Sequence, residues 1–218
     1  MQRVLILGAG GHAQVVADIL MRGRGAGKDV ELLGYLDDDP GLAWKSFLGL
    51  SVLGVVSDLS RIKHDTVVVA IGDNRARSKV YVRLIEQGER FAVALHPSAN
   101  IAPGVKLGPG TMVCAGVVVN PQSEVGEDVI LNTGCTVDHH NRIGPHAHIA
   151  PGAHLGGEVT VEEGAMVGIG AIVLPQVRIG AWSVVGARAV VLKDVPPGVT
   201  VMGVPARPME KKGDNDKS

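Results

Sequence analysis

Residues 143–173 read IGPHAHIAPGAHLGGEVTVEEGAMVGIGAIV, with an aliphatic residue at every sixth position. The period continues without insertion in both directions, back to Ile101 and on to Val191. Neither an α-helix nor an alternating β-strand has a period of six, so the pattern indicates a repeat of six-residue units. The sixteen aliphatic positions are Ile101, Leu107, Val113, Val119, Val125, Leu131, Val137, Ile143, Ile149, Leu155, Val161, Val167, Val173, Ile179, Val185 and Val191.

A second column of small or β-branched residues follows the aliphatic column at an offset of four, as at Ala147, Ala153 and Val159. Glycine often comes directly after the aliphatic residue, as at Gly144 and Gly156. We expect each unit to place one large and one small residue inward and to turn at a glycine. Short strands joined by such turns are typical of a left-handed parallel β-helix, in which three hexapeptide repeats form one triangular coil. Residues 97–209 therefore predict an all-β helix of about five coils, stacked about 4.8 Å apart.

The composition agrees with a folded chain that has a narrow core. The 218 residues are 45% hydrophobic and 20% charged, with 30 glycines and only two Trp, two Tyr and two Phe. A narrow prism filled by aliphatic and small side chains explains why aromatic rings are scarce. The formal net charge is −1, so the chain offers no basic field for a nucleic acid or an anionic membrane surface. We expect no nucleic-acid partner.

Residues 1–96 have a different pattern, in which buried strands alternate with helical spacing. The strand at 3–7 (RVLIL) leads into GAGGH at 8–12 and then into a helical stretch at 13–21. Further strands are predicted at 30–36, 66–71 and 91–95, with a second helix at 75–89. A strand, a glycine turn and a helix begin a nucleotide-binding unit, so we predict a small Rossmann-like α/β domain ahead of the β-helix.

Polar residues and glycines gather where the predicted parallel strands end, which is the edge at which such sheets bind ligands. Gly8, Gly10 and Ala13 are compatible with a dinucleotide fingerprint, but a domain of this length holds only half of a full dinucleotide fold. A mononucleotide therefore fits better, with its phosphate at the helix N-terminus. A tight turn without a ligand is the alternative. The candidate binding residues are Gly10, Gly11, His12, Asp37, Asp38, Gly72 and Asn74, and Arg75 and Arg77 are candidates for phosphate contacts.

Four segments carry a family resemblance: the GxGGH opening, IGDN at 71–74, VDHH at 137–140 within the hexads, and GVPAR at 203–207. Together they resemble the bacterial sugar O/N-acyltransferases of the bacillosamine N-acetyltransferase and sialic acid O-acetyltransferase type, over nearly the whole chain. The resemblance implies a homotrimer with active sites between subunits and acetyl-CoA as co-substrate. It also implies an acceptor, the C4 amine of a UDP-linked amino-deoxy sugar, in surface or protein glycan biosynthesis. O-acetylation of sialic acid or another sugar is the alternative.

The same resemblance implies roles for residues of the β-helix. His139 matches the general base, a role that suits an imidazole because it is largely neutral near pH 7. Gly157, which follows His139 by one coil of 18 residues, matches a glycine whose backbone N–H holds the thioester oxygen across the trimer interface. His148 matches a histidine that contacts the acetyl group. Positions that line the pantetheine channel of CoA correspond to Ile169 and Ala187.

On the acceptor side, the resemblance assigns residues of the amino-terminal domain to the nucleotide sugar. The glycine turn and its histidine bind the nucleotide sugar, the paired aspartates bind the nucleoside, and the third strand end lies near the diphosphate or the sugar. In that order these residues are Gly10, Gly11 and His12, then Asp37 and Asp38, then Gly72 and Asn74.

The residue after the base departs from the family pattern, which often has a carboxylate where this chain has His140. Asp138 precedes the base, but strand alternation points it the other way. Glu158 follows His140 by one coil, and we hypothesise that it supplies the missing carboxylate across the ladder. The hypothesis predicts that Glu158→Gln flattens or shifts the pH dependence of turnover.

Two other functions stay open. His146, His148 and His154 fall within one coil's length, so they are candidate ligands of a β-helix metal enzyme. The nucleotide-type domain argues against that reading, and we expect no metal. A non-catalytic nucleotide-sugar binder is the other alternative, and such a protein would release no thiol from acetyl-CoA.

The remaining features bear on location and order. Cys114 and Cys135 lack a metal-type spacing and nothing secretory precedes them, so we expect a cytoplasmic protein with reduced, non-catalytic cysteines. No apolar run approaches the length of a membrane span, so no membrane insertion is expected. Residues 41–63 are predicted to form a loop or a weak strand, and the charged residues 210–218 a disordered tail.

Overall fold

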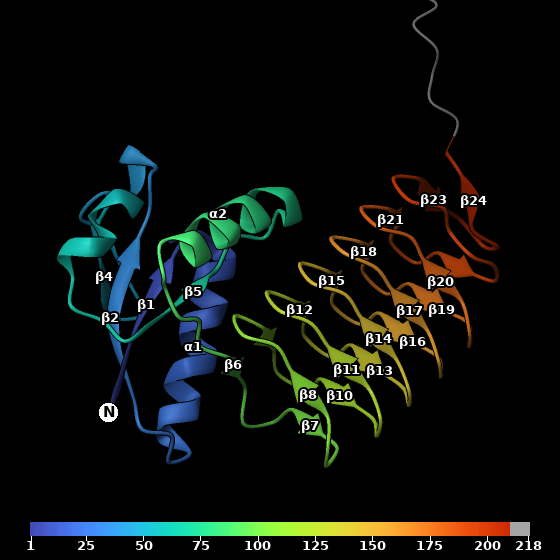
Figure 1. The fold of residues 1–218 in the computed structure, drawn as a ribbon, viewed down its shortest axis with the longest axis horizontal. Helices are drawn as coiled ribbons and strands as arrows, with labels where there is room; N and C mark the ends of the chain where they lie inside the picture. The colour runs from blue at the N-terminus through green and yellow to red at the C-terminus, as the bar shows by residue number, and fades with distance from the viewer. Residues whose placement is uncertain (210–218) are drawn as a thin grey trace, which may run out of the picture.

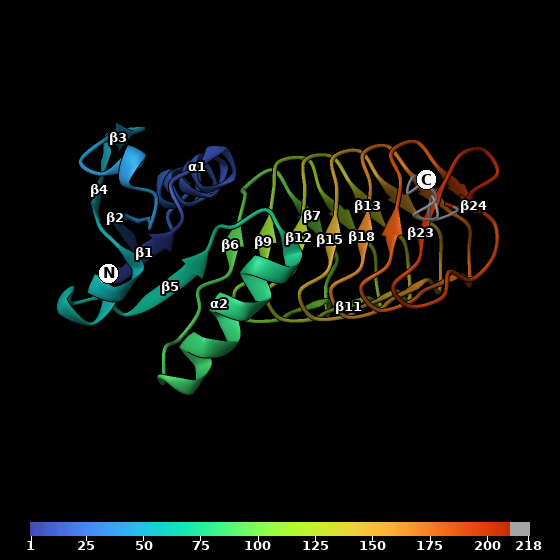
Figure 2. The same cartoon turned by 90° about the horizontal axis from the view of Figure 1, so that it is seen from above.

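The computed structural model describes residues 1–209, which fold into two parts (Figures 1 and 2). A small α/β domain lies at one end of a long prism of stacked coils (Figure 1). The tail predicted at 210–218 lies outside the described residues. No helix within residues 1–209 is both long enough and apolar enough to cross a membrane.

The amino-terminal domain is a five-stranded sheet with the strand order β3-β4-β2-β1-β5. All pairs are parallel except β3 with β4. Its elements are β1 (Gln2–Leu7), α1 (Gly11–Gly25), β2 (Val30–Leu36), the 3-10 helix η1 (Pro40–Leu42), β3 (Ser46–Phe47), β4 (Leu50–Gly54), the 3-10 helix η2 (Val56–Arg61), β5 (Thr66–Val69) and α2 (Asn74–Glu86). The segment predicted as a loop or weak strand at 41–63 thus contains two strands, and β4 extends the sheet beside β2.

Alternate residues of β1 point to opposite faces of this sheet, and each face is covered. Val4 and Ile6 belong to the same buried cluster as Val16 of α1, whereas Leu5 and Leu7 pack in a cluster with α2. A central strand buried on both faces reads as a continuous apolar run, which is why residues 3–7 are apolar after the arginine. The helices on the two faces leave the carboxyl ends of the strands free to carry a site.

The hexads form a parallel β-helix whose strands pair at a separation of 18 residues, as Ile130 with His148. Strands β7 to β22 each end on one of the sixteen aliphatic residues, and all of these except Ile101 and Leu107 are buried. The strands are β6 (Ala94–Leu95), β7 (Asn100–Ile101), β8 (Lys106–Leu107), β9 (Met112–Val113), β10 (Val118–Val119), β11 (Glu124–Val125), β12 (Ile130–Leu131), β13 (Thr136–Val137), β14 (Arg142–Ile143), β15 (His148–Ile149), β16 (His154–Leu155), β17 (Thr160–Val161), β18 (Met166–Val167), β19 (Ile172–Val173), β20 (Arg178–Ile179), β21 (Val184–Val185), β22 (Val190–Val191), β23 (Thr200–Met202) and β24 (Arg207–Pro208).

These strands build three flat faces. The first sheet has the order β22-β19-β16-β13-β10-β7, the second β20-β17-β14-β11-β8, and the third β24-β23-β21-β18-β15-β12-β9-β6. Figure 2 shows the coils stacked along one axis, with the amino-terminal domain against the first coils. The fold is therefore the predicted one, a Rossmann-like α/β domain followed by a left-handed β-helix.

The turns differ from the expectation in one respect. Corner residues with positive φ lie three positions after the aliphatic residue, and several are not glycine, such as His140 at 58° and Glu158 at 61°. Gly144, which directly follows its aliphatic residue, does not have a positive φ. A Cβ at Gly144 would lie 2.8 Å from the backbone nitrogen of Glu163 in the next coil. Such glycines are required by the close stacking of coils, and not by the conformation of the turn.

The boundary between the two parts also differs in detail from the expected limits, 1–96 and 97–209. The strand predicted at 91–95 is divided, because Phe91 forms a single bridge with Val67 of β5, while β6 pairs with β9 and so begins the third sheet. The β-helical ladder thus starts two residues before the chain leaves the predicted domain.

Helix α2 lies beside the first coils of the β-helix (Figure 2). Its residues 74–81 contact one corner column of the coils, formed by Gly110, Asp128, His146, Gly164 and Trp182. A Cβ at Gly110 would lie 2.8 Å from the ring of Tyr81, and Asn74 Nδ2 donates a hydrogen bond to the carbonyl of Gly164 at 3.1 Å. A helix of 13 residues rises about 20 Å, which matches about four coil spacings of 4.8 Å. The helix is therefore long enough to run beside the whole corner column.

Candidate active site

One candidate site is a hollow of about 530 Å³ at the corner between the first and second sheets, lined by His139, His140, Arg142, Glu158 and Thr160. The corner follows strand β13, and the positive φ of His140 turns the chain there, so the two adjacent histidines both face solvent. The Nδ1 atoms of His139 and His140 lie 3.0 Å apart, and the two rings are nearly perpendicular at 85°. When His139 Nδ1 carries the proton shared by this pair, His139 Nε2 is left free to accept another.

Gly157 lies directly against the ring of His139. A Cβ there would lie 2.5 Å from Cε1 and 2.8 Å from Nε2 of His139. Within the described part of the chain the Gly157 N–H makes no hydrogen bond, whereas its carbonyl accepts one from Gln176 N at 2.9 Å. An imidazole ring and a backbone N–H without a partner among residues 1–209 thus belong to residues in direct contact.

Glu158 shares this hollow, but its side chain makes no hydrogen bond to either histidine. Its backbone N–H donates to the carbonyl of His139 at 2.9 Å, which places it one coil above His140, as the spacing predicts. Its side-chain Oε2 instead accepts a hydrogen bond from Gln176 Nε2 at 3.3 Å. The role of Glu158 as a partner of the base stays a prediction.

Two neighbours of His139 were not predicted as site residues. Asp138 Oδ1 accepts hydrogen bonds from Asn120 Nδ2 and from the backbone N–H of His139, each at 2.8 Å, and these bonds lower the pKa of Asp138. The carboxylate therefore fixes the main chain of His139, and not its ring. The other neighbour, Arg142, begins strand β14 on the second sheet.

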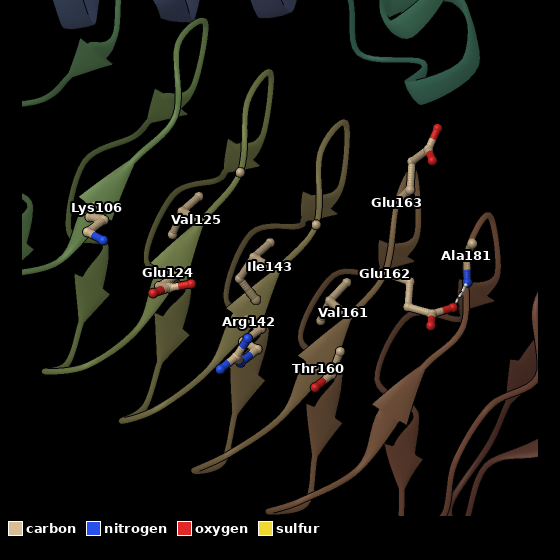
Figure 3. A pocket seen from close by; sticks show the side chains of 12 residues that line it. Lys106, Glu124, Val125, Arg142, Ile143, Thr160, Val161, Glu162, Glu163 and Ala181 are labelled. Atoms are coloured by element: carbon tan, nitrogen blue, oxygen red, sulfur yellow. Dashed lines mark hydrogen bonds between the residues drawn. The ribbon is translucent and has the colours of Figure 1, made fainter.

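The outward face of the second sheet begins at the corner that carries His139 and His140, which we call the histidine corner. Figure 3 shows Arg142 and Thr160 on neighbouring strands, preceded by Lys106 and Glu124 on earlier coils. These residues line an open hollow of about 670 Å³ that shares Arg142 and Thr160 with the histidine hollow. Each of these four residues stands one position before an aliphatic residue of the hexads. Because the aliphatic residue points into the core and strand residues alternate, the residue before it faces outward.

The second candidate site lies at the start of helix α1. Its N-cap is Gly10, which provides no side-chain cap, and the first turn contains no acidic residue. Free N–H groups at a helix N-terminus attract anions. No side chain occupies the positions where Cβ atoms of Gly10 and Gly11 would stand, since a Cβ at either glycine meets no atom within 4 Å. The side-chain Nε2 of His12 is buried there without a hydrogen-bond partner among residues 1–209.

The two aspartates after β2 are held by the backbone. Asp37 Oδ2 accepts a hydrogen bond from Ala9 N at 2.6 Å, so it braces the glycine turn, and its Oδ1 accepts from Asp39 N at 2.8 Å. Asp38 Oδ1 accepts from Val56 N at 2.8 Å. Both carboxylates lie at the predicted strand end, and Asp37 connects the end of β2 with the glycine turn before α1.

Gly72 and Asn74 line a cleft of about 260 Å³ between the start of α2 and the third sheet. Trp182 closes one side, where its ring lies on Gly164 and the guanidinium of Arg75 stands 4.7 Å above the ring centre. Arg75 is exposed and is thus accessible to a ligand. The phosphate contact expected of Arg77 is wrong, because its side chain is fully buried and hydrogen-bonded to the β-helix.

His148 lies on the outward face of the third sheet, under the amino-terminal domain. It is 9% exposed, its Nε2 lies 3.1 Å from Asn132 Nδ2, and its Nδ1 has no partner in the described structure. Burial, with the charge of Arg77 as a smaller cause, lowers the pKa of His148 to about 3 and that of His12 to about 4. His12 is a further, smaller cause of the lowered pKa of His148.

Ile169 and Ala187 stack on the corner between the third and first sheets. The carbonyl of Ile169 accepts a hydrogen bond from Arg188 N at 2.8 Å, which fixes the two coils in register. Ile169 is 58% exposed, which is unusual for a large aliphatic side chain. An apolar ligand lying along the coils would cover both residues.

The histidines of the metal-enzyme alternative do not converge. His146 Nδ1 bonds to Asp128 Oδ2 at 2.8 Å, His148 to Asn132, and His154 Nδ1 to Thr136 Oγ1 at 2.8 Å. His146 is buried under α2, whereas His154 is exposed on the first sheet. Their geometry gives no support to a shared metal ion.

The two cysteines are buried in the β-helix core. Burial raises the pKa of the Cys114 thiol to about 11 and that of Cys135 to about 12. Thiols with such values are inert as nucleophiles near neutral pH.

A β-helix with a histidine at a coil corner, joined to a nucleotide-type domain, defines a hexapeptide-repeat acyltransferase. Residues 3–84 match the family described as the PglD N-terminal domain, and residues 158–193 match the bacterial transferase hexapeptide family (six repeats). Over 214 residues the chain is 30% identical to GDP-perosamine N-acetyltransferase of Escherichia coli O157:H7, covering 94% of this chain and 96% of that protein.

Solved structures agree over the whole length. The PerB structure from Caulobacter crescentus, in complex with CoA and GDP-perosamine, is 40% identical, with a TM-score of 0.87 over 96% of this chain and 98% of the other. The acetyltransferase domain of PglB from Neisseria gonorrhoeae is 34% identical, with a TM-score of 0.88 over 96% and 100%. The chain therefore belongs to the family of sugar N-acetyltransferases, which are acetyl-CoA-dependent acyltransferases.

Proposed function

We propose that this enzyme transfers an acetyl group from acetyl-CoA to the C4 amine of a nucleotide-linked amino-deoxy sugar, in surface or protein glycan biosynthesis. The observation that carries the proposal is the contact between the His139 ring and the backbone of Gly157. It places a proton acceptor and an unpaired backbone donor at one corner, which are the two groups that acyl transfer to an amine requires.

In the proposed reaction His139 takes the proton from the attacking nitrogen through Nε2, while its Nδ1 keeps the contact with His140. The Gly157 N–H stabilises the negative charge that develops on the carbonyl oxygen. Acetyl-CoA supplies the acetyl group as a thioester: the new C–N bond forms, the C–S bond breaks, and the protonated His139 gives its proton to the leaving CoA thiolate. Ile169 and Ala187 hold the pantetheine arm through shape and backbone contacts. His148, held by Asn132, contacts the acetyl group as a neutral imidazole.

The acceptor binds through the amino-terminal domain. The uncapped start of α1 at Gly10 and Gly11 receives the diphosphate, because free helix N–H groups attract an anion. The buried Nε2 of His12 has no partner among residues 1–209 and donates to the same anion when it carries the ring proton. Asp37 and Asp38 lie beside the nucleoside. Gly72 lies with Asn74 in the cleft next to the sugar. The family resemblance implies a UDP-linked sugar, whereas the similarity to GDP-perosamine N-acetyltransferases supports a GDP-linked one, so both are tested below.

The active form is a homotrimer with sites between subunits. In one chain, the histidine corner lies between the first and second sheets, whereas His148 and Ile169 lie on the third sheet and its far corner. The first sheet lies between these two groups of residues. It exposes the apolar side chains of Ile172, Leu174 and Leu192. Association through this sheet brings one subunit's His139 toward its neighbour's His148. Sedimentation equilibrium is expected to give three chains per particle.

Thiol release from acetyl-CoA tests the function directly. Native protein, His139→Ala and the control Gln122→Asn are compared with UDP- and GDP-linked 4-amino sugars and with free sialic acid as acceptors. Gln122 occupies the same corner one coil earlier than His140 and also has a positive φ, of 65°, which asparagine tolerates. We expect acceptor-dependent release by the native protein and the control, and a loss of at least about a hundredfold in His139→Ala.

Each outcome separates the alternatives. Release with only one nucleotide identifies the carrier, and release with sialic acid alone replaces N-acetylation by O-acetylation. No release with any acceptor, although acetyl-CoA and nucleotide sugar both bind, would favour a non-catalytic binder.

A further inference from the structure

A complete arginine side chain is buried where the two parts of the molecule meet. Arg77 on helix α2 is 0% exposed, and so is Asp128 on the β-helix corner that it contacts. A buried charge is costly unless it is paired and fully hydrogen-bonded. This pair therefore marks a contact that the fold maintains at considerable expense in desolvation.

The guanidinium of Arg77 uses its whole fork to join separate elements. Nε donates to the carbonyl and Oδ2 of Asp128, at 3.2 and 3.1 Å, and Nη2 donates to the carbonyl of His146 at 2.7 Å. Nη1 turns back to its own domain and donates to the carbonyl of Ile71 at 3.1 Å and to Asn74 Oδ1 at 3.0 Å. One planar group thus holds the end of β5, the start of α2 and two successive coils.

Both β-helix partners stand at corner positions, with φ of 53° at Asp128 and 59° at His146. His146 Nδ1 bonds to the same Asp128 Oδ2 that Arg77 contacts, at 2.8 Å. The amide of Asn74 is fixed at both ends, since its Oδ1 faces Arg77 and its Nδ2 faces Gly164. The network is too specific in direction to be replaced by an ammonium group, which lacks the planar fork.

We call the contact of Arg77 with Asp128 and His146 the joint. It lies between the acceptor half of the proposed site, on the amino-terminal domain, and the thioester half, on the β-helix. Arg77 Nη1 donates to Asn74, which belongs to the acceptor half with His12, and Nη2 donates to the carbonyl of His146, two residues before His148 of the thioester half. Resting on the proposed function, we propose that Arg77 is a positioning residue for acetyl transfer, which sets the acceptor bound at His12 in register with the thioester at His148. Displacements near 1 Å in such an arrangement reduce turnover about a hundredfold.

The alternative is that Arg77 only stabilises the fold, and a compensated variant separates the two roles. Arg77→Met leaves Asp128 as an uncompensated buried charge and is expected to lower both stability and turnover. Arg77→Met combined with Asp128→Leu removes both charges, and such replacements of buried pairs often restore stability. We expect this double variant to regain the native thermal midpoint but to keep a kcat ten- to a hundredfold below native, with an unchanged KM for acetyl-CoA.

Arg77→Lys tests the fork itself, since it keeps the charge but cannot make the parallel bonds, and we expect kcat to fall without loss of folding. Arg83→Met is the matched control, because Arg83 is an exposed arginine on the same helix. If the double variant recovers kcat together with stability, or if Arg77→Lys turns over like the native enzyme, the positioning role is wrong.

Hydrogen exchange gives a readout that does not depend on activity. Amides of α2 and of the corner at Asp128 and His146 are expected to exchange faster in Arg77→Lys than in Arg83→Met, while the distant coils stay protected. Equal exchange in the two variants would contradict the joint itself. A native protein that releases no thiol but shows this difference would overturn the proposed function and leave the joint established as a purely structural contact.

Discussion

The ring of His139 lies on the backbone of Gly157 with no room for a side chain between them. A Cβ at Gly157 would stand 2.5 Å from Cε1 and 2.8 Å from Nε2 of His139. The two residues are 18 positions apart, so they occupy the same corner on successive coils. The β-helix therefore brings His139 and Gly157 together by register alone, with no insertion or loop.

Gly157→Ala is expected to abolish most activity while leaving the fold intact. Gly157 does not have a positive φ, so alanine fits the backbone, and the exposed His139 ring swings away to relieve the clash. We expect kcat to fall at least about tenfold, because the base leaves its productive position, with a change in unfolding free energy within about 0.5 kcal/mol. Gly25→Ala, at a glycine with open space around it, is the control. Native turnover by Gly157→Ala would show that the contact has no role in the reaction.

His140 occupies the place of the expected carboxylate, and its Nδ1 faces that of His139. His140→Glu is expected to move the acid limb of kcat against pH to higher pH, because a carboxylate stabilises the protonated, inactive form of the neighbouring imidazole. Glu158→Gln serves as the comparison, since the Glu158 carboxylate bonds to Gln176 and not to a histidine. A displaced profile in Glu158→Gln and none in His140→Glu would make Glu158 the partner of the base.

Most of the β-helix was predictable because its six-residue period can be read directly from the order of residues. Every sixth residue from Ile101 to Val191 faces the core, and the separation of 18 placed Gly157 beside His139 and Ile169 beside Ala187. The parallel sheet was equally accessible, since β1 and β2 coincide closely with apolar runs. Regular spacing and continuous burial are the two signals that need no knowledge of tertiary contacts.

The joint between the two parts could not be predicted in the same way. Arg77 looks like any arginine in the first turns of a helix, and Asp128 like any polar corner residue, and they are 51 positions apart. Only the docking of α2 along the corner column makes them partners. The His139–His140 contact also lacked a signal, because the direction of two adjacent side chains depends on the left-handed turn at His140.

The glycines of the hexads serve two purposes that stability measurements can separate. A Cβ at Gly108 would lie 2.4 Å from the carbonyl carbon of Gly126 in the next coil, whereas Gly104 has a positive φ of 83° and open space. Gly108→Ala is expected to lower the unfolding free energy by about 1–3 kcal/mol through overpacking. Gly104→Asn is expected to change it by less than about 1 kcal/mol, because asparagine tolerates the left-handed region. Equal losses in urea unfolding would mean that turn conformation governs both positions.

Burial of His148 makes part of the stability sensitive to acid. The pKa of His148 is lowered to about 3 in the folded chain, chiefly by burial, against an ordinary value near 6.5. Between these values the unfolded chain binds a proton that the folded chain excludes, so folding is favoured above pH 6.5 and weakens as the pH falls. His148→Gln removes this titration while its side-chain oxygen still accepts from Asn132. Between pH 6.5 and 4.5 the native protein is expected to lose more stability than the variant, approaching about 1.4 kcal/mol for each pH unit. Parallel stability curves for the two proteins in urea would show that His148 is protonated as easily in the folded chain as in the unfolded one.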